Sequence, residues 1–294
     1  MTRGVSARWW SMAVTMAFVT ACGGGDSGAT PGARPTLPSG MMAAAVTNAD
    51  GSAPAVPFAT STPVVRPTVL ERFPHDSLAY TQGLLLDGKR LFESTGLEGQ
   101  SEVREVALRT GRVIRHTATP DAAFGEGIAV LNDRLYQLTW RRGRGTVYSP
   151  AGLRVIDSVR YDGEGWGLAT DGSSLYQSDG TSIVRVLEPK TFTVMRTFDV
   201  REAGQPVRWL NELEWVNDEL WANVYQTNFI ARIDPTSGTV KGWVDVSALL
   251  TSDERTFVGV RGGTANGIAY DRARDMVLLT GKLWPWLFVV TVPR

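Results

Sequence analysis

The chain has 294 residues, of which 43% are hydrophobic and 20% charged, and these values are ordinary for a globular protein. Lysine plus arginine and aspartate plus glutamate each count 30, so the formal net charge of zero argues against binding to nucleic acid or to an acidic membrane surface. The single cysteine excludes an internal disulfide. With only two histidines a zinc site is a poor interpretation, whereas a carboxylate-ligated calcium site stays open.

The first 21 residues predict a signal peptide. Arg3 and Arg8 give a positively charged start, and residues 9–21 form an apolar stretch shorter than the ~20 residues that span a bilayer. Cys22 follows at once and precedes three glycines, a pattern similar to the lipobox of bacterial lipoproteins; the alternative is a secretory peptide whose cysteine is incidental. We therefore expect export from a bacterial cell as a cell-envelope lipoprotein, periplasmic or in the outer membrane, which contacts the membrane only through lipid on Cys22.

Residues 22–63 are rich in Gly, Ala, Ser, Thr and Pro and contain few large apolar side chains. Such a segment cannot bury enough surface to offset the entropy of ordering it, so it is expected to be a disordered tether. The folded catalytic or binding domain is predicted to span residues 64–294.

A repeated unit runs through this domain. It consists of one variable residue, usually Gly and an aliphatic residue, then a turn and a Leu-aromatic strand. Its copies are Gln82-Gly83-Leu84, Glu126-Gly127-Ile128, Trp166-Gly167-Leu168, Asn211-Glu212-Leu213 and Asn266-Gly267-Ile268. Further short strands follow each copy, such as those at residues 146–149, 183–187 and 229–233. Four short strands per copy, at spacings of about 40 to 55 residues, predict an all-β, five-bladed β-propeller.

The last copy leaves room for only three strands before the chain ends at Arg294. We expect residues 64–72, upstream of the first copy, to supply its missing outer strand and so to close the ring. The alternative fold is a β-sandwich, which also contains many short strands but does not explain a regular fivefold unit.

The variable residue of each copy is predicted to lie at one mouth of the central channel. These residues are Gln82, Glu126, Trp166, Asn211 and Asn266. Buried polar groups cost free energy unless they are paired, so four polar side chains in such a ring favour a ligand site over a purely structural one. The Gly that follows them lets a ligand or a neighbouring backbone approach closely.

Other residues are expected to reach the same mouth. Phe124 precedes one inner strand, whereas Trp140, Tyr225 and Lys282 lie where the second strands end. Together they predict a pocket with aromatic walls, one carboxylate and one ammonium group. The alternatives are that the tryptophans pack between blades, that Lys282 is a solvated surface charge, and that Glu126 pairs with an arginine.

An ordered set of motifs resembles the plant and bacterial glutaminyl cyclases across nearly all of residues 64–294. The motifs are Phe73-Pro74-His75-Asp76, Thr81-Gln82-Gly83-Leu84, Phe124-Gly125-Glu126-Gly127, Leu138-Thr139-Trp140, Gly165-Trp166-Gly167-Leu168, Leu210-Asn211-Glu212-Leu213-Glu214, Asn223-Val224-Tyr225-Gln226-Thr227, Asn266-Gly267-Ile268 and Thr280-Gly281-Lys282. The resemblance implies a five-bladed propeller with its site at one channel mouth, working without zinc. We also expect a monomer that needs no cofactor.

The resemblance also implies an activity and roles for several residues. The family cyclises an N-terminal glutamine of peptides or proteins to pyroglutamate and releases ammonia, which makes it an acyltransferase. Its acidic catalytic residue corresponds to Glu126, and other site positions correspond to Gln82, Trp140, Trp166, Asn211 and Lys282. The chain departs from the common family pattern at Tyr225, where Trp is frequent, and at Tyr80, where Phe is common. Substrate fit is therefore expected to differ at Tyr225.

The expected mechanism uses Glu126 as a proton shuttle between the substrate's α-amine and the departing nitrogen. Lys282 is expected to stabilise the oxyanion or to hold Glu126 ionised, and Phe124, Tyr225 and Asn266 to line the substrate pocket. Three other functions stay open from the residues alone: a non-catalytic propeller that binds peptides or glycans, a calcium-dependent hydrolase, and a structural lipoprotein.

Overall fold

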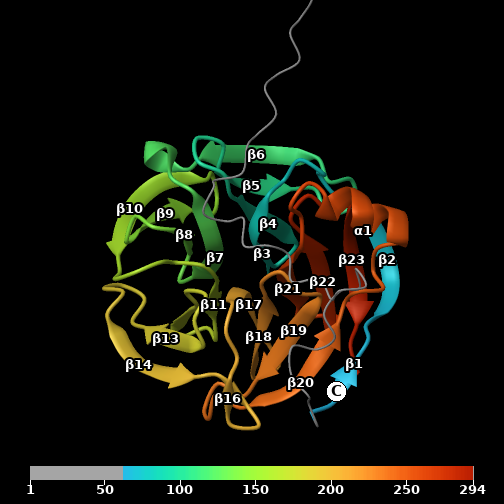
Figure 1. The fold of residues 1–294 in the computed structure, drawn as a ribbon. Coiled ribbons are helices and arrows are strands. Elements are labelled where there is room, and N and C mark those ends of the chain that lie inside the picture. Colours follow the sequence, from blue (N-terminus) through green and yellow to red (C-terminus); the bar gives the residue numbers. More distant parts are fainter. Residues whose placement is uncertain (1–61, 294) are drawn as a thin grey trace, which may run out of the picture. The chain divides into compact units, whose positions relative to one another are not determined.

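The computed structural model describes residues 62–293, and in this range the chain forms six β-sheets, five of which are arranged around a central axis as the blades of a propeller (Figure 1). The expected fivefold propeller is confirmed. Blade 1 contains β3 (Thr81–Asp87), β4 (Arg90–Thr95), β5 (Glu102–Val106) and β6 (Val113–Ala118). Blade 2 contains β7 (Gly125–Leu131), β8 (Arg134–Thr139), β9 (Arg144–Ser149) and β10 (Arg154–Arg160). Blade 3 contains β11 (Leu168–Thr170), β12 (Leu175–Gln177), β13 (Ile183–Leu187) and β14 (Val194–Asp199).

The last two blades take strands from both ends of the described range. Blade 4 contains β17 (Leu210–Val216), β18 (Glu219–Val224), β19 (Phe229–Ile233), β20 (Val240–Asp245) and the short β1 (Val64–Val65). Blade 5 contains β21 (Ala265–Asp271), β22 (Met276–Gly281), β23 (Trp286–Thr291) and β2 (Thr68–Pro74). The inner strands β3, β7, β11, β17 and β21 contact one another in that order, and β21 contacts β3, so the ring is closed.

Closure by a strand from the N-terminal side is confirmed, with one correction to its extent. The segment expected as a single outer strand at residues 64–72 divides in two. β2 pairs antiparallel with β23 and completes blade 5, whereas β1 pairs parallel with β20 of blade 4. Pro67 separates the two strands, and a proline has no backbone N–H to donate to a ladder. The N-terminal segment therefore joins two blades.

Tight turns connect the first two strands of each blade. The pairs Asn132-Asp133 and Asn217-Asp218 have positive φ at both residues, between 45° and 64°, as the two-residue hairpin turn with the matching twist requires. Asn and Asp tolerate this left-handed conformation better than most residues. These two Asn-Asp pairs therefore form the hairpin turns of blades 2 and 4.

The repeated glycine of the inner strands has a packing role. A Cβ added at Gly127 would lie 2.5 Å from the backbone nitrogen of Leu168, and one at Gly83 would lie 2.8 Å from that of Ile128. Each glycine thus lets the next inner strand approach closely. In blade 4 the equivalent residue is Glu212, whose carboxylate accepts hydrogen bonds from the backbone N–H groups of Leu84 and Ile268.

The hydrophobic core is divided among the five interfaces between adjacent blades. Five clusters of buried aliphatic and aromatic residues each draw on two neighbouring blades. Trp243, Phe92 and Leu135 are among their fully buried side chains. Burial of each such side chain contributes about 1.5–3 kcal/mol, so the stacking of blades holds the channel and its mouths in place.

Three smaller elements were not expected. The α-helix α1 (Ser252–Gly259) begins with a capping box between Thr251 and Glu254, and it lies in the connection from blade 4 to blade 5. A two-stranded hairpin, β15 (Arg201–Glu202) with β16 (Gln205–Pro206), leads into β17, and a short 3-10 helix, Pro120–Ala122, leads into β7. No helix within residues 62–293 is long and apolar enough to cross a membrane.

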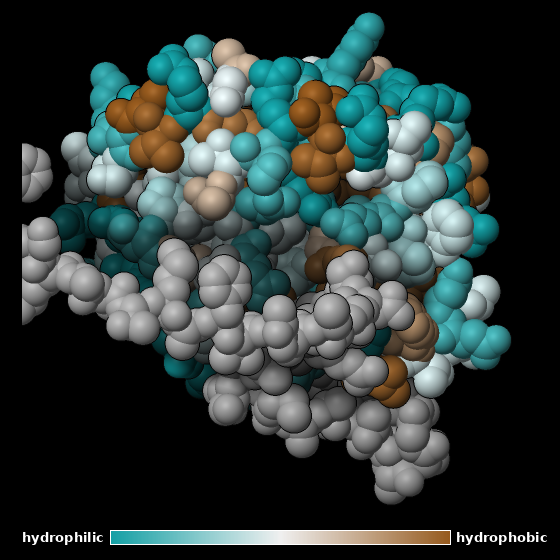
Figure 2. Space-filling view, turned by 90° about the horizontal axis from the view of Figure 1, so that it is seen from above, coloured by the Kyte–Doolittle hydropathy of each residue, from teal (hydrophilic) through white to brown (hydrophobic). Residues whose placement is uncertain are grey.

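The outer face seen in Figure 2 is mainly hydrophilic, and its hydrophobic residues form separate spots. Exposed apolar side chains on the outer strands include Leu70, Ile114, Val155 and Met195. Single exposed apolar residues of this kind are normal on protein surfaces. Among the residues described, the dense grouping of aromatic and polar side chains is therefore found at the channel mouth.

Candidate active site

The start of each inner strand brings the five variable residues to one mouth of the channel. Gln82, Glu126, Asn211 and Asn266 lie in the first two residues of β3, β7, β17 and β21, and Trp166 lies two residues before β11. The four polar residues are at most 1% exposed, and Trp166 is 7% exposed. The ring predicted from the repeat is thus present, and it is almost fully buried.

Gln82 connects the two charged residues of the site. Its Nε2 donates to Glu126 Oε1 at 3.1 Å, and its Oε1 accepts from Lys282 Nζ and from Asn266 Nδ2. An ammonium group can only donate, so the Gln82 oxygen must face Lys282 and its NH₂ group must face Glu126. Asn266 Nδ2 also donates to the Thr81 carbonyl at 2.9 Å. One amide therefore fixes the relative positions of the acid and the amine.

Lys282 and Glu126 have opposite pKa shifts with the same main cause. Burial raises the pKa of Glu126 well above its usual value; the charge of Lys282 opposes this shift and that of Glu164 adds to it. Burial lowers the pKa of Lys282 to about 8, against the opposing charge of Glu126. Burial thus favours the neutral form of both groups, and with a pKa of about 8 Lys282 is still mainly an ammonium ion at neutral pH. The two structural alternatives for these residues are wrong. Lys282 is buried and is therefore not a solvated surface charge, and Glu126 pairs with Gln82 and not with an arginine.

Three oxygen atoms of the site have no hydrogen-bond partner within residues 62–293. They are Glu126 Oε2, Asn211 Oδ1 and Asn266 Oδ1. An unpaired buried acceptor costs roughly 1–3 kcal/mol, so such atoms are normally paired. The structure brings Gln82, Glu126, Asn266 and Lys282 into one hydrogen-bonded group. Asn211 lies at the equivalent place in blade 4, where its side chain joins no bond of that group.

Five aromatic rings, which we call the aromatic collar, pack in one cluster at this mouth. They are Tyr80, Phe124, Trp140, Trp166 and Tyr225, and Leu97 and Leu283 pack with them. The ring centroids of Tyr80 and Phe124 are 6.1 Å apart, those of Phe124 and Trp140 5.7 Å, and those of Trp166 and Tyr225 5.8 Å. These separations lie in the range favoured by aromatic pairs. Every aromatic residue expected to line the pocket belongs to the collar.

Polar contacts link two pairs of rings in the collar, Tyr80 with Tyr225 and Trp140 with Trp166. On one side, the hydroxyl groups of Tyr80 and Tyr225 hydrogen-bond to each other, and Lys282 Nζ lies 4.6 Å and 5.2 Å from their ring centroids. On the other side, Glu164 accepts from the indole N–H groups of Trp140 and Trp166. The two departures from the common family pattern, Tyr80 and Tyr225, thus contact each other through the groups that Phe and Trp lack.

Glu164 was missed by reasoning from the sequence. It lies between two glycines in Gly163-Glu164-Gly165, immediately before the Trp166 repeat. It is not one of the five repeated positions, and the only signal was an isolated acidic residue next to a site motif. Only the fold places Trp140 of blade 2 within reach of the same carboxylate.

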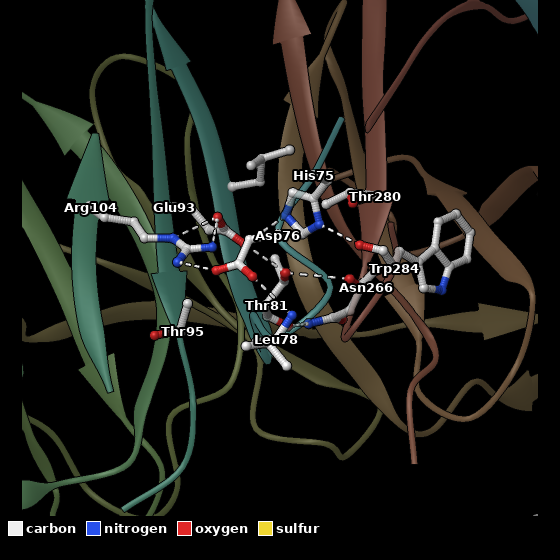
Figure 3. Close-up of polar contacts among 12 residues, drawn as sticks. His75, Asp76, Leu78, Thr81, Glu93, Thr95, Arg104, Asn266, Thr280 and Trp284 are labelled. Atoms are coloured by element: carbon white, nitrogen blue, oxygen red, sulfur yellow. Dashed lines mark hydrogen bonds and ion pairs between the residues drawn. The ribbon is translucent and has the colours of Figure 1, made fainter. Parts of the chain in front are cut away.

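A second group missed from the sequence lies beside the site, between blades 1 and 5 (Figure 3). His75 Nδ1 faces the Trp284 carbonyl at 2.7 Å, and His75 Nε2 faces Glu93 Oε1 at 3.0 Å. Both ring nitrogens face acceptors, so the ring is an imidazolium ion. Glu93 also accepts from Thr81 at 2.7 Å and from Arg104 at 2.9 Å. Because Thr81 precedes Gln82 and Trp284 follows Lys282, this group fixes both segments that carry the site.

Metal ligands are not gathered at the mouth. Within residues 62–293 no three or more His, Cys, Asp or Glu side chains are placed so that they could hold a metal ion. The zinc-free and cofactor-free chemistry remains a prediction. Cys22, the signal peptide and nearly all of the tether lie outside the described residues.

Comparison with known proteins shows which family has this sequence and fold. The family model for glutamine cyclotransferase matches residues 40–292. The glutaminyl-peptide cyclotransferase of Arabidopsis thaliana is 44% identical over 229 residues, which cover 77% of this chain and 71% of that protein. The crystal structure of the glutaminyl cyclase of Myxococcus xanthus superimposes with a TM-score of 0.71 and 33% identity, covering 79% of this chain and 98% of that one.

Proposed function

This chain belongs to the glutamine cyclotransferase family, and on that premise we propose that its channel mouth cyclises the N-terminal glutamine of peptides, with Glu126 as the proton carrier. Because the chain is a homologue of glutaminyl-peptide cyclotransferase, it is a transferase, and the alternative of a purely structural lipoprotein is wrong. The roles of individual residues rest on the geometry of the site.

The observation that supports this function best is the match between unpaired groups and substrate groups. The site offers three unpaired acceptors, Glu126 Oε2, Asn211 Oδ1 and Asn266 Oδ1, and one ammonium donor, Lys282. An N-terminal glutamine offers the N–H donors of its amine and carboxamide and one carbonyl oxygen. A glutamine bound with its carboxamide oxygen toward Lys282 would satisfy these acceptors, and the collar would hold its methylene groups in a bent shape.

The reaction requires one bond to form, one to break and one proton to move. The α-nitrogen attacks the carboxamide carbon, and Lys282 stabilises the negative charge that develops on the oxygen. The carbon–nitrogen bond to the leaving group then breaks. Glu126 accepts the proton that the attacking nitrogen releases and gives a proton to the departing nitrogen, and the upward shift of its pKa by burial suits it to carry this proton. The products are a pyroglutamyl peptide and ammonia, and Glu126 returns to its starting state.

The direct test is mass spectrometry of a glutamine-initiated peptide incubated with purified protein, together with an ammonia assay. We expect loss of one ammonia from this peptide and no change in the same peptide with an acetylated α-amine, which cannot attack. Binding of the free peptide without ammonia release would instead support a non-catalytic propeller. Incubation with a strong chelator tests the metal: activity lost with the chelator and restored by zinc would contradict metal-free chemistry.

Export and lipid anchorage at Cys22 form a separate proposal, supported by the signal-like residues 1–21 and the glycines after the cysteine. Full-length protein produced in a bacterial host should fractionate with membranes. The Cys22→Ala variant should lose the acyl mass and leave the membrane fraction. Equal fractionation of the two proteins would reject lipid anchorage, and size-exclusion chromatography of the soluble form would test the expected monomer.

A further inference from the structure

The carboxylate of Glu164 receives three hydrogen bonds from two neighbouring segments. Its Oε2 accepts from Trp140 Nε1 at 2.7 Å and from Trp166 Nε1 at 2.9 Å, and its Oε1 accepts from Arg141 Nε at 3.0 Å. Indole N–H groups are donors only, and bonds to a charged acceptor are among the stronger ones. Two rings of the collar are therefore attached to one oxygen atom.

This attachment joins parts of the collar that do not stack on each other. Trp140 follows β8 in blade 2, and Trp166 precedes β11 in blade 3. Within the described residues, Trp140 has a ring contact with Phe124, and Trp166 has ring contacts with Tyr225 and Trp209, but the two indoles form no ring pair. Glu164 supplies the connection that ring stacking does not.

The ion pair with Arg141 does not account for Glu164. The Arg141 side chain is 59% exposed, and exposed ion pairs contribute little to stability because water screens them. The two tryptophans are 6% and 7% exposed, so their N–H groups depend on Glu164 for a partner. The guanidinium carbon of Arg141 also lies 3.7 Å from the Trp140 ring centroid, which places Arg141 on the outer side of the same wall.

We propose that Glu164 is a positioning residue that holds the indoles of Trp140 and Trp166 as one rigid wall of the pocket, so that a bound glutamine is kept bent for ring closure. The role in ring closure rests on the proposed function; the attachment of the two indoles does not. Small displacements of positioning groups can cost about 100-fold in rate. Glu164 thereby acts on the reaction without touching the reacting atoms.

The charge of Glu164 gives a second and separate signature. Its carboxylate is one of the charges that raise the pKa of Glu126, besides burial. The other charged group that faces Glu126 is Lys282, which acts in the opposite direction. The remaining titratable neighbours are the phenol groups of Tyr80, Tyr161 and Tyr225, whose pKa values Glu126 helps to raise. Removal of the charge at Glu164 should therefore move the ionisation of Glu126 to lower pH, an effect that a merely structural contact would not have.

The test compares three variants with the wild type. Glu164→Ala removes both indole bonds, and we expect kcat/KM to fall about 10- to 100-fold. Glu164→Gln keeps one acceptor oxygen for the indoles, so we expect a smaller loss, with the ionisation of Glu126 in the kcat/KM profile moved to lower pH. Glu98→Gln, at an exposed glutamate in the loop after β4, is the matched control and should behave as wild type.

A double-mutant cycle shows whether Glu164 acts through the indoles. Trp140→Phe removes one N–H donor, so Glu164→Ala should cost clearly less in that background than in the wild type. Equal costs in both backgrounds would overturn the proposal, as would Glu164→Ala with kcat/KM within threefold of wild type. Should Glu164→Ala fail to fold, an unchanged pH profile in Glu164→Gln would overturn it.

Nitrogen NMR of the indole N–H groups separates this proposal from the proposed function. The signals of Trp140 and Trp166, assigned with the Trp140→Phe and Trp166→Phe variants, should move in Glu164→Ala, whereas those of the other tryptophans should stay. If the indole signals move in Glu164→Ala but the wild type releases no ammonia, the proposed cyclisation is wrong, whereas the attachment of the two indoles to Glu164 is confirmed. Unmoved signals with normal ammonia release would reject the attachment alone.

Discussion

Two buried glutamates on neighbouring blades show how the pKa of the same side chain can be shifted in opposite directions. Glu93 on β4 and Glu126 on β7 are each 1% exposed. Burial would raise the pKa of Glu93, but the charges of His75 and Arg104 and its hydrogen bonds outweigh that effect and lower the pKa to about 2. The pKa of Glu126 is raised well above its usual value, since only Lys282 opposes its burial.

The number and charge of the donors decide the difference. Glu93 accepts from an imidazolium, a guanidinium and a hydroxyl group, and neither of its oxygens is unpaired. Glu126 accepts from one neutral amide and keeps one oxygen without a partner among the described residues. Pairing with cations favours the ionised form of Glu93, whereas burial with one neutral partner favours the protonated form of Glu126. We infer that Glu93 serves stability and Glu126 serves chemistry.

Replacement of Glu126 should have the largest effect. Glu126→Gln keeps the size of the side chain and removes the proton carrier, so we expect kcat to fall about 10²- to 10⁴-fold. Its free energy of unfolding should stay within about 1 kcal/mol of wild type, because no ion pair is lost. Ammonia release and urea unfolding measure the two quantities. Retained turnover would remove Glu126 from the mechanism.

Replacement of Glu93 should show the reverse pattern. Glu93→Gln leaves the buried imidazolium of His75 without its anion and Arg104 with only Asp76 and Glu102, and we expect a loss of about 3–5 kcal/mol in the free energy of unfolding. In the fraction that remains folded, kcat should change by less than tenfold, because Glu93 touches no substrate group. Urea unfolding and turnover per folded molecule measure the two quantities. The control is Glu71→Gln, at a half-buried glutamate on β2 whose side chain is 41% exposed, and it should stay within about 0.5 kcal/mol of wild type. A stable Glu93→Gln protein without activity would contradict the comparison.

The sequence predicted the surroundings of Glu126 better than those of Glu93. Glu126 stands in a repeated unit, and repeats that close into a ring must bring equivalent positions together. His75, Glu93 and Arg104 occupy no repeated position, and their contacts depend on how blade 1 packs against the closing strand. Such contacts between distant segments have no periodic signal.

Differences in the local backbone explain the other misses. Residues 64–72 read as one strand because Val and Thr favour strands, yet Pro67 divides them. The helix α1 has eight residues, too few for a helical period to stand out against neighbouring strands. The role of Glu164 depends on its hydrogen bond with Trp140, which lies 24 residues away in the sequence. The fold and the ring of site residues followed from repetition, whereas the contacts that support them required coordinates.

The pH dependence of stability should come from the His75–Glu93 side. Burial lowers the pKa of His75, but the charge and hydrogen bond of Glu93 and the bond to Trp284 outweigh this effect and raise the pKa above 6.5. A raised pKa contributes stability that is full below the unfolded value and is lost as pH rises through the folded value. A tenfold higher affinity of the folded protein for this proton corresponds to about 1.4 kcal/mol of stability. The stability difference between wild type and His75→Gln should therefore be largest below about pH 6.5 and should shrink as the pH rises above that value.

Glu93 should produce the opposite slope in acid. Its folded pKa of about 2 lies below the usual value of 4.5, so the stability that it contributes is present above 4.5 and is lost as pH falls toward 2. Urea unfolding of wild type, His75→Gln and Glu93→Gln across pH measures both slopes. A difference between wild type and His75→Gln that does not change with pH would show that His75 is neutral in the folded protein.

The smallest effect is expected at Thr81, which lies on the boundary between the two regions. Its hydroxyl donates to Glu93 at 2.7 Å, and its backbone carbonyl accepts from Asn266 of the site. Thr81→Val has the same shape and loses only the hydroxyl, so we expect a loss of about 1 kcal/mol in the free energy of unfolding, because His75 and Arg104 still pair with Glu93. Thr81→Ser, which keeps the donor, should keep that bond.

Turnover by these two variants decides how separate the regions are. The backbone bond from Asn266 to Thr81 survives both substitutions, so kcat should stay within about twofold of wild type if the hydroxyl serves only Glu93. A tenfold fall in kcat for Thr81→Val, with normal kcat for Thr81→Ser, would mean that the ion network positions Gln82 through this one hydroxyl. Glu93 and Glu126 would then still differ in charge, but both would affect the rate of the reaction.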